Sequence, residues 1–339
     1  MPWEDVKQIF RPETVHMGVM QIDPEKCSRT RGSSCQLCYE NCPFRAWAAP
    51  EPGKPPQLKE EYECFSCYNC MVACPRGAVS IVEPYHVDEG YWKTEPHALP
   101  ARLPLEPKDA DGNPDQWNAI ERAIYNRRSV RNFRDKPVPE HLIRRVLEAG
   151  RFAPSAGNCQ PWRFIVITNK ALLQEMDEAI WAGVNMIYQM FKNDDLVKQL
   201  AAGYEMAPQQ SGTWDPRLAL GGMGSISKRN GPPLLNAPAV ILILGDERAI
   251  SGPEINAGIC GQNMNLVCNS LGIKCCWVGF AQVINQVPPI KEKLGIEYPW
   301  RIITSLVMGY PRFKQEGIVP REYRPVTWFR EDRAGPEIE

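Results

Sequence analysis

Cysteines carry the clearest chemical signal in this chain of 339 residues. Eight of the thirteen fall into two short groups near the N-terminus, and each group ends in Cys-Pro. The second group separates its cysteines by two, two and three residues, which lets one turn of chain supply three thiolates to a metal centre while the fourth reaches a neighbouring centre. The spacing predicts two thiolate-bound metal centres. The groups are Cys27, Cys35, Cys38 and Cys42, and Cys64, Cys67, Cys70 and Cys74.

Both groups resemble the cysteine runs of bacterial two-cluster ferredoxins. The resemblance implies two 4Fe-4S clusters with crossed ligation, so that each cluster takes its last cysteine from the other group. In the first group seven residues, SRTRGSS, stand where two are usual. A pair of structural zinc sites is the alternative, although zinc does not explain two groups that each end Cys-x3-Cys-Pro. The implied ligands are a first cysteine set, Cys27, Cys35, Cys38 and Cys74, and a second cysteine set, Cys42, Cys64, Cys67 and Cys70.

A second kind of chemistry is suggested by RRSVRNF, residues 127–133. On an extended stretch, Arg127, Ser129 and Arg131 would place two guanidinium groups and a hydroxyl on one side, a combination suited to a dianionic phosphate. Arg128 adds a further positive charge. The alternative for this stretch is a basic helix end that complements the helix dipole.

Two further motifs lie downstream. In APSAGNCQPWRFIVI, residues 153–167, Pro154 and Ser155 shape a turn, and Asn158 and Gln160 offer amide groups before an apolar strand. In LGIKCCWVGF, residues 271–280, the backbone at Val278 and Gly279 follows a short apolar run.

Together these motifs resemble the nitroreductase family over roughly residues 115–330. The resemblance implies an oxidoreductase with FMN, whose phosphate is held by the arginine motif together with Arg321 or Arg324. It also implies that Asn158 and Gln160 bind the polar edge of the ring and that the backbone near Val278 and Gly279 meets flavin N5. It further implies a homodimer with FMN at the subunit boundary, and an organic acceptor such as a nitroaromatic, quinone, activated alkene or halogenated aromatic.

The elements that must position these motifs predict an α+β protein. One helix is expected after a cap at Asp115, because Trp117, Ile120 and Ile124 recur at helical spacing, and another between Pro139 and Gly150. The apolar runs 164–168 and 239–245 predict central strands, and a last strand ends at Gly309. The expected organisation is a ferredoxin-like domain at 1–90, a linker at 91–114, a nitroreductase-like domain with a mixed central sheet flanked by helices at 115–330, an insertion at about 181–236 that covers the flavin, and a tail at 331–339.

The composition and the motifs of the chain limit the kinds of partner that we expect. The 39 basic and 40 acidic residues nearly cancel, so no overall field favours nucleic acid or a membrane surface. No export signal is visible, which predicts a cytoplasmic protein. No G-x-G-x-x-G follows a strand, so the expected donor is an external ferredoxin-like protein, or NAD(P)H bound over the flavin. The four histidines are expected to form no cluster. A non-catalytic electron carrier or redox sensor is the alternative function.

Overall fold

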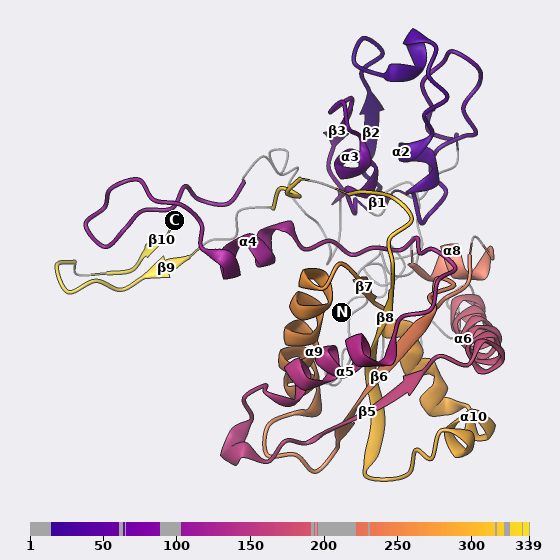
Figure 1. The fold of residues 1–339 in the computed structure, drawn as a ribbon, viewed down its shortest axis with the longest axis vertical. Coiled ribbons are helices and arrows are strands. Elements are labelled where there is room, and N and C mark those ends of the chain that lie inside the picture. The colour runs from indigo at the N-terminus through magenta and orange to yellow at the C-terminus, as the bar shows by residue number, and fades with distance from the viewer. Residues whose placement is uncertain are drawn as a thin grey trace.

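The computed structural model describes residues 15–60, 64, 66–88, 103–190, 193, 195, 222–229, 231–315, 317–321, 326–333 and 335–338. Figure 1 shows a small N-terminal module, which we call the cysteine module, beside a larger α+β domain. The module pairs β2 with β3 and β1 with β4, both antiparallel, around a core that includes Met20, Trp47 and Ile81. Its elements are β1 (Val15–His16), β2 (Val19–Ile22), η1 (Ser28–Arg31), α2 (Leu37–Glu40), α3 (Asn69–Ala73), β3 (Val79–Glu83) and β4 (His86–Val87).

The larger domain is built on a four-stranded sheet with the order β5-β6-β8-β7. Its strands are β5 (Trp162–Ile167), β6 (Ala239–Asp246), β7 (Lys274–Trp277) and β8 (Trp300–Gly309). Its helices are α4 (Ala119–Asn126), α5 (Glu140–Arg151), η2 (Ala156–Asn158), α6 (Lys170–Met190), α8 (Gly224–Ser227), α9 (Pro253–Ser270), η4 (Gly279–Gln286) and α10 (Pro288–Lys293). A short hairpin follows, made of β9 (Thr327–Trp328) and β10 (Glu337–Ile338).

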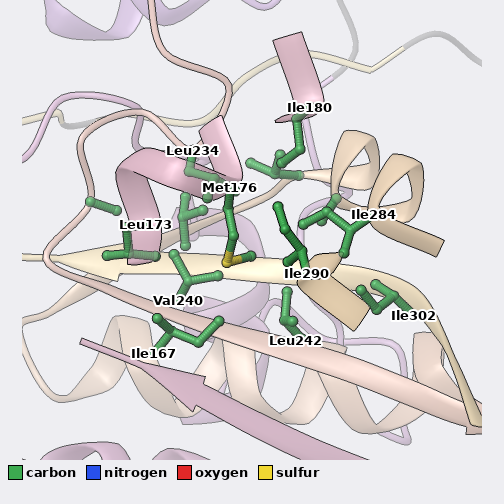
Figure 2. Close-up of a cluster of buried hydrophobic side chains, with 14 of the residues drawn as sticks. Ile167, Leu173, Met176, Ile180, Leu234, Val240, Leu242, Ile284, Ile290 and Ile302 are labelled. Atoms are coloured by element: carbon green, nitrogen blue, oxygen red, sulfur yellow. The ribbon is translucent and has the colours of Figure 1, made fainter. Parts of the chain in front are cut away.

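Helices cover both faces of this sheet, which explains why β6 is apolar at successive positions. Val240 and Leu242 point into one core together with α6, η4 and α10 (Figure 2). The alternate residues Ile241 and Ile243 point into a second core with α5 and α9. Since side chains alternate across a strand, a strand between two helical layers needs apolar residues at every position.

The predicted strands and the α+β class are confirmed, but two details differ. Each described pair of neighbouring strands is antiparallel, so the expected mixed sheet is not seen in the described residues. Burial of β6 by helices on both sides produces its continuous apolar run, whether its neighbours are parallel or antiparallel. The cap of α4 is Asn118 rather than Asp115, because Asn118 and Glu121 form a reciprocal capping box.

An arm extends from the larger domain in Figure 1, made of residues 103–126 with α4 and residues 326–338 with β9 and β10. Several of its large apolar side chains face outward, including Ile120, with 68% of its surface exposed, and Phe329, with 80%. Helix α4 therefore has an apolar stripe, as predicted, but within one chain the stripe is not covered. In the described part of the chain, no helix has the length and apolar character needed to cross a membrane.

Candidate active site

The first cysteine set lies around one small cavity. Cys27, Cys35, Cys38 and Cys74 all line it, although Cys74 belongs to the other group in sequence. Burial, together with the neighbouring Cys74, Cys35 and Cys27, raises the pKa of the Cys38 thiol to about 12. A metal that binds thiolates removes this penalty by replacing the protons with positive charge. The four residues converge as a metal centre requires.

The insertion between Cys27 and Cys35 folds as a compact turn. It contains η1, and Gly32 ends it in the left-handed region at φ 85°. Arg29 is buried and donates to three carbonyls, those of Lys54 at 2.8 Å, Cys35 at 3.0 Å and Glu51 at 2.7 Å. Because this arginine organises the extra residues, the insertion does not keep Cys27 from its set.

The second cysteine set also converges. Burial raises the pKa of the Cys64 thiol to about 12, with Cys67 and Cys42 among its electrostatic neighbours. Burial likewise raises the pKa of Cys70 well above its ordinary value, and Cys67, Cys42 and Cys64 raise it more than Cys38 of the first set does. Cys42, from the first group in sequence, thus lies with three cysteines of the second.

The two Cys-Pro turns repeat one geometry. The Ala46 amide donates to Cys42 Sγ and the Ala78 amide to Cys74 Sγ, each at 3.3 Å. Arg45 and Gly77, one residue before these alanines, have φ of 55° and 59°. Amide bonds to ligand sulfurs tune the reduction potential of iron-sulfur clusters. The duplicated turn therefore presents two sulfurs in equivalent settings.

A cavity of about 210 Å³ lies between the cysteine module and the larger domain, and we call it the principal cavity for this position, although other cavities are larger. Pro43 and Phe44, which follow Cys42 directly, form part of its wall. Cys276, Val278 and Gly279 line it from the larger domain. Sequence reasoning placed Val278 and Gly279 at the flavin but assigned nothing to Pro43 and Phe44, because only the folded chain brings them there.

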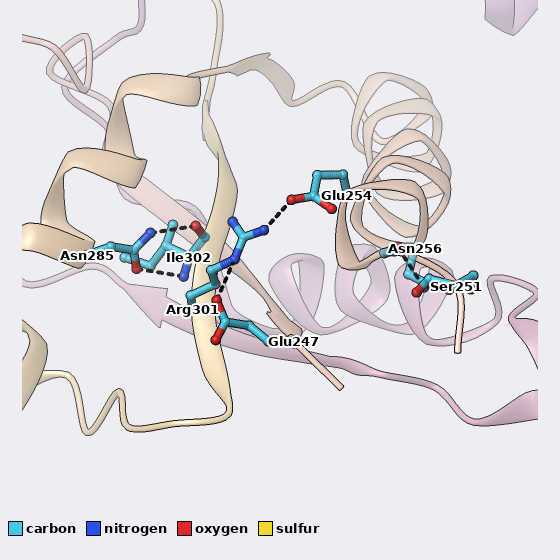
Figure 3. Close-up of polar contacts among 8 residues, drawn as sticks. Glu247, Ser251, Glu254, Asn256, Asn285, Arg301 and Ile302 are labelled. Carbon is cyan, nitrogen blue, oxygen red and sulfur yellow. Dashed lines mark hydrogen bonds and ion pairs between the residues drawn. The ribbon is translucent and has the colours of Figure 1, made fainter. Parts of the chain in front are cut away.

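Polar contacts hold both ends of η4 against β8. The Asn285 side chain donates to the Ile302 carbonyl at 2.8 Å and accepts from the Ile302 amide at 2.9 Å (Figure 3). Ile302 lies in the part of β8 that does not pair with β7. The Val278 amide donates to the Ser305 carbonyl at 2.9 Å, and the Ser305 hydroxyl donates to the Val278 carbonyl at 2.8 Å.

These bonds occupy the Val278 backbone, whereas Gly279 is the first residue of η4. Amides at a helix start have no partner within the helix. A Cβ placed on Gly279 would meet no atom within 4 Å, so the backbone here is open to a ligand.

The arginine motif meets Arg321 at a second cavity of about 440 Å³, which Arg127, Arg128 and Arg321 all line. Burial lowers the pKa of Arg127, and the like charges of Arg321 and Arg131 lower it further. Arg127 also contacts the Ser129 hydroxyl at 3.4 Å. Positive groups that lower one another's pKa repel each other, so a bound anion would stabilise them.

The remaining arginines differ in role. Arg128 donates to the carbonyls of Gly317, at 3.0 Å, and of Tyr125, which ties the motif to the chain near Arg321. Burial lowers its pKa to about 10, aided by Arg127 and Arg321. Arg131 is half-buried in the wall of the principal cavity, within electrostatic reach of Cys276, Cys67 and Cys42. Arg324 lies outside the described residues.

The loop with Pro154, Ser155, Asn158 and Gln160 does not join these residues within one chain. Trp277 pairs with Leu306 and hence lies level with Ile241 and Val166. Trp162, at the start of β5, therefore lies three strands away from Trp277 and four residues further along the strand direction. The usual spacings of strands and residues in a sheet convert this into a separation of about 20 Å. The loop is exposed, and its backbone enters the left-handed region at Asn158 and Gln160, with φ of 52° and 46°. Such strain is often found at functional sites.

Both halves of this arrangement are similar to known protein families. The profile of the nitroreductase family matches residues 124–310, more than half of the chain. The chain belongs to the nitroreductase family. The profile of a 4Fe-4S dicluster domain matches residues 32–79. The nitroreductase domain is thus preceded by a ferredoxin-like 4Fe-4S domain, and the chain is an FMN-type oxidoreductase.

Several individual proteins are similar to the nitroreductase domain. A putative NADH dehydrogenase/NAD(P)H nitroreductase of Archaeoglobus fulgidus is 25% identical over 197 residues, which cover 57% of this chain and 86% of that protein. The 5,6-dimethylbenzimidazole synthase of Rhodospirillum rubrum is 25% identical over 209 residues, 59% of this chain and 85% of that one. The crystal structure of a nitroreductase with bound FMN from Desulfitobacterium hafniense is 23% identical, with a TM-score of 0.47 over 61% of this chain and 96% of that chain.

Proposed function

We propose that this chain takes single electrons from an external low-potential donor at two 4Fe-4S clusters and delivers electron pairs to an organic acceptor at FMN. Clusters exchange one electron at a time, whereas flavin exchanges one or two, which is the chemistry that the two cofactors supply. The first and second cysteine sets are the proposed ligands. The proposed donor is a ferredoxin-like protein, with NAD(P)H as the other candidate.

The observation that carries this proposal is the shared wall of the principal cavity. Cys42 belongs to the second cysteine set, and the next two residues, Pro43 and Phe44, line the cavity that Val278 and Gly279 line from the other side. The Asn132 side chain donates to the Glu40 carbonyl at 3.3 Å, and the Gln315 side chain donates to Asn41 Oδ1 at 2.9 Å. Two bonds therefore hold the residues just before Cys42 to the nitroreductase domain, as a direct electron inlet requires.

The described residues fit FMN. The arginines at positions 127 and 321, with Ser129, would hold the phosphate, since their mutual repulsion is relieved by a dianion. Gly279 would present its amide to the flavin ring without a side chain in the way. An amide donor does not titrate, so it orients the ring without competing for the proton of the reaction.

A homodimer would complete the site. The loop with Asn158 and Gln160 is too far from Gly279 in its own chain, yet it is exposed and its backbone is strained, so we propose that each loop serves the cavity of the partner. The uncovered apolar side chains of the arm, such as Ile120 and Phe329, supply surface for the same interface.

The substrate would enter beside the segment that precedes β6. Gly222, Ser225 and Ile226 form one wall of the principal cavity, which supports the expectation that the region of residues 181–236 covers the flavin. Trp181, at the start of this region, stacks under the Arg229 guanidinium at 3.7 Å. Further aromatic residues of the region, Phe191, Tyr204 and Trp214, lie outside the described residues. The acceptor is a planar organic molecule in this proposal.

The test begins with protein purified without oxygen, analysed for iron, sulfide and FMN. We expect about eight iron atoms per chain. Flavin reduction is then followed with reduced ferredoxin and with NADH separately, in the parent and in Cys38→Ser. The variant should lose flavin reduction by ferredoxin, while its photochemically reduced flavin still reacts with nitroaromatics and quinones. Equal reduction by ferredoxin in both proteins would refute the inlet, and a lack of turnover with every acceptor would favour a non-catalytic carrier.

A further inference from the structure

Two of the four histidines meet at the edge of the cysteine module, contrary to the expectation that they form no cluster. His16 on β1 and His86 on β4 stack with ring centroids 4.4 Å apart and an angle of 13° between the rings. The Asp88 carboxylate lies beside both: His16 Nε2 is 2.6 Å from Oδ2, and His86 Nε2 is 3.6 Å from Oδ1. One ligand atom from each residue lies within 4.8 Å of the others.

The second nitrogen of His86 determines which atom is left for a ligand. His86 Nδ1 is 3.1 Å from the Pro84 carbonyl, which only accepts hydrogen bonds, so Nδ1 carries the proton. In the neutral ring Nε2 then presents a lone pair to a carboxylate oxygen 3.6 Å away, too far for a hydrogen bond. A cation placed between these two electron-rich atoms would be stabilised by both.

We propose that His16, His86 and Asp88 bind one divalent transition-metal ion of the zinc type. Zinc accepts imidazole nitrogen and carboxylate oxygen at about 2.0 to 2.2 Å, which places two ligands of a tetrahedral ion about 3.4 Å apart. The observed 3.6 Å between His86 and Asp88 matches this separation, whereas the His16 contact must open by less than 1 Å and the two nearly parallel rings must splay so that both lone pairs point at the ion.

The surroundings suit an imidazole ligand. A bond from the distal ring nitrogen to a backbone carbonyl is the usual support for a histidine that binds metal, and His86 has it. Two neutral imidazoles and one carboxylate leave the ion with a net positive charge and with room for water as a further ligand. The side chains of His16 and Asp88 are about half exposed, so an ion can enter from solvent.

The ion would join two distant stretches of chain. His16 and Asp88 are 72 residues apart in sequence, and His16 lies in β1 whereas Asp88 directly follows the paired strand β4. Both cysteine sets lie between them in the sequence. A metal bridge here closes the cysteine module at its open end, and it contributes stability by constraining the unfolded chain.

The experiment uses the full chain with its iron and FMN in place, after dialysis against a chelator and a measurement of iron. Zn²⁺ is titrated by calorimetry into the parent, His86→Ala, Asp88→Asn and the control His141→Ala, whose exposed histidine lies on α5. We expect one Zn²⁺ per chain in the parent and control, and at least a tenfold weaker affinity in the other two. Asp88→Asn preserves size and both rings, so its loss of affinity is not a folding defect.

Two results would overturn the proposal. One is binding of Zn²⁺ with the same affinity in all four proteins, or no binding at all by the parent. The other is the release of iron in step with Zn²⁺ uptake, which would place the zinc on the cysteine sets. Iron content and the paramagnetic resonance of the reduced clusters, measured before and after titration, separate these cases.

Discussion

The replacement of Arg127 by alanine separates two explanations of the arginine motif. If Arg127 binds the FMN phosphate, its loss weakens FMN binding without harm to the flavin-free protein. The reason is that burial and the like charges of Arg321 and Arg131 already oppose its charged state. If the motif were only a basic helix end, the same change would leave FMN binding intact.

The size of the effect follows from the bond that is lost. A hydrogen bond to a charged group contributes about 1.5 to 3 kcal/mol, so the dissociation constant of FMN should rise by about 10- to 150-fold. The unfolding temperature of the flavin-free variant should stay the same or rise slightly, because relief of repulsion between partly exposed charges contributes on the order of a few tenths of a kcal/mol.

Riboflavin provides the decisive comparison because it has the same ring and ribityl chain but no phosphate. Fluorescence titrations of flavin-free protein with FMN and with riboflavin should show that Arg127→Ala weakens FMN alone. Arg145→Ala, a change at an exposed arginine on α5, is the matched control and should alter neither affinity. An equal loss for both flavins, or unchanged FMN affinity, would show that Arg127 does not contact the phosphate.

Three further changes test other parts of the structure. Cys74→Ser should alter the paramagnetic resonance of the cluster on the first cysteine set more than that on the second, and the reverse pattern would contradict crossed ligation. Gly261→Ala should lower the free energy of unfolding by about 1 to 3 kcal/mol, because its Cβ would lie 2.2 Å from the Trp277 ring; an unchanged denaturation midpoint would contradict this packing. Burial raises the pKa of Asp177 to about 6, so ionisation above pH 6 destabilises the fold, although the Leu234 amide bond at 2.6 Å remains. Above pH 6 the free energy of unfolding of Asp177→Asn should therefore exceed that of the parent by on the order of 1 kcal/mol, after allowance for the partial exposure of Asp177. Denaturant titrations should show that this difference vanishes below about pH 4.

Features that depend on neighbours in the sequence were predictable. Strand β6 follows from its apolar run, and β8 from its β-branched stretch up to Gly309. The capping box at Asn118 was also readable, because Glu121 stands three residues later, the spacing typical of this cap. The sequence therefore specifies this cap at Asn118 locally.

Features that depend on tertiary contacts were not predictable. Nothing local to Phe44 shows that it lines a cavity with Gly279, since the two are more than 200 residues apart. The contact of His16 with His86 depends on the pairing of β1 with β4, which no short motif specifies. The periodicity around Ile120 correctly gave a helix, but a pattern of apolar residues does not say what covers them.

The separation of about 20 Å between the loop at residues 153–161 and its chain's own cavity has a consequence for inheritance. In the proposed dimer each flavin site draws Arg127 from one chain and Asn158 from the other. A cell with two gene copies, one damaged at Arg127 and the other at Asn158, would assemble mixed dimers in which both defects fall on the same site and the second site is whole. Two copies damaged at the same motif would have no such rescue. Alleles of this gene would therefore sort into two complementation groups within a single cistron, divided by the half of the shared site that each one damages.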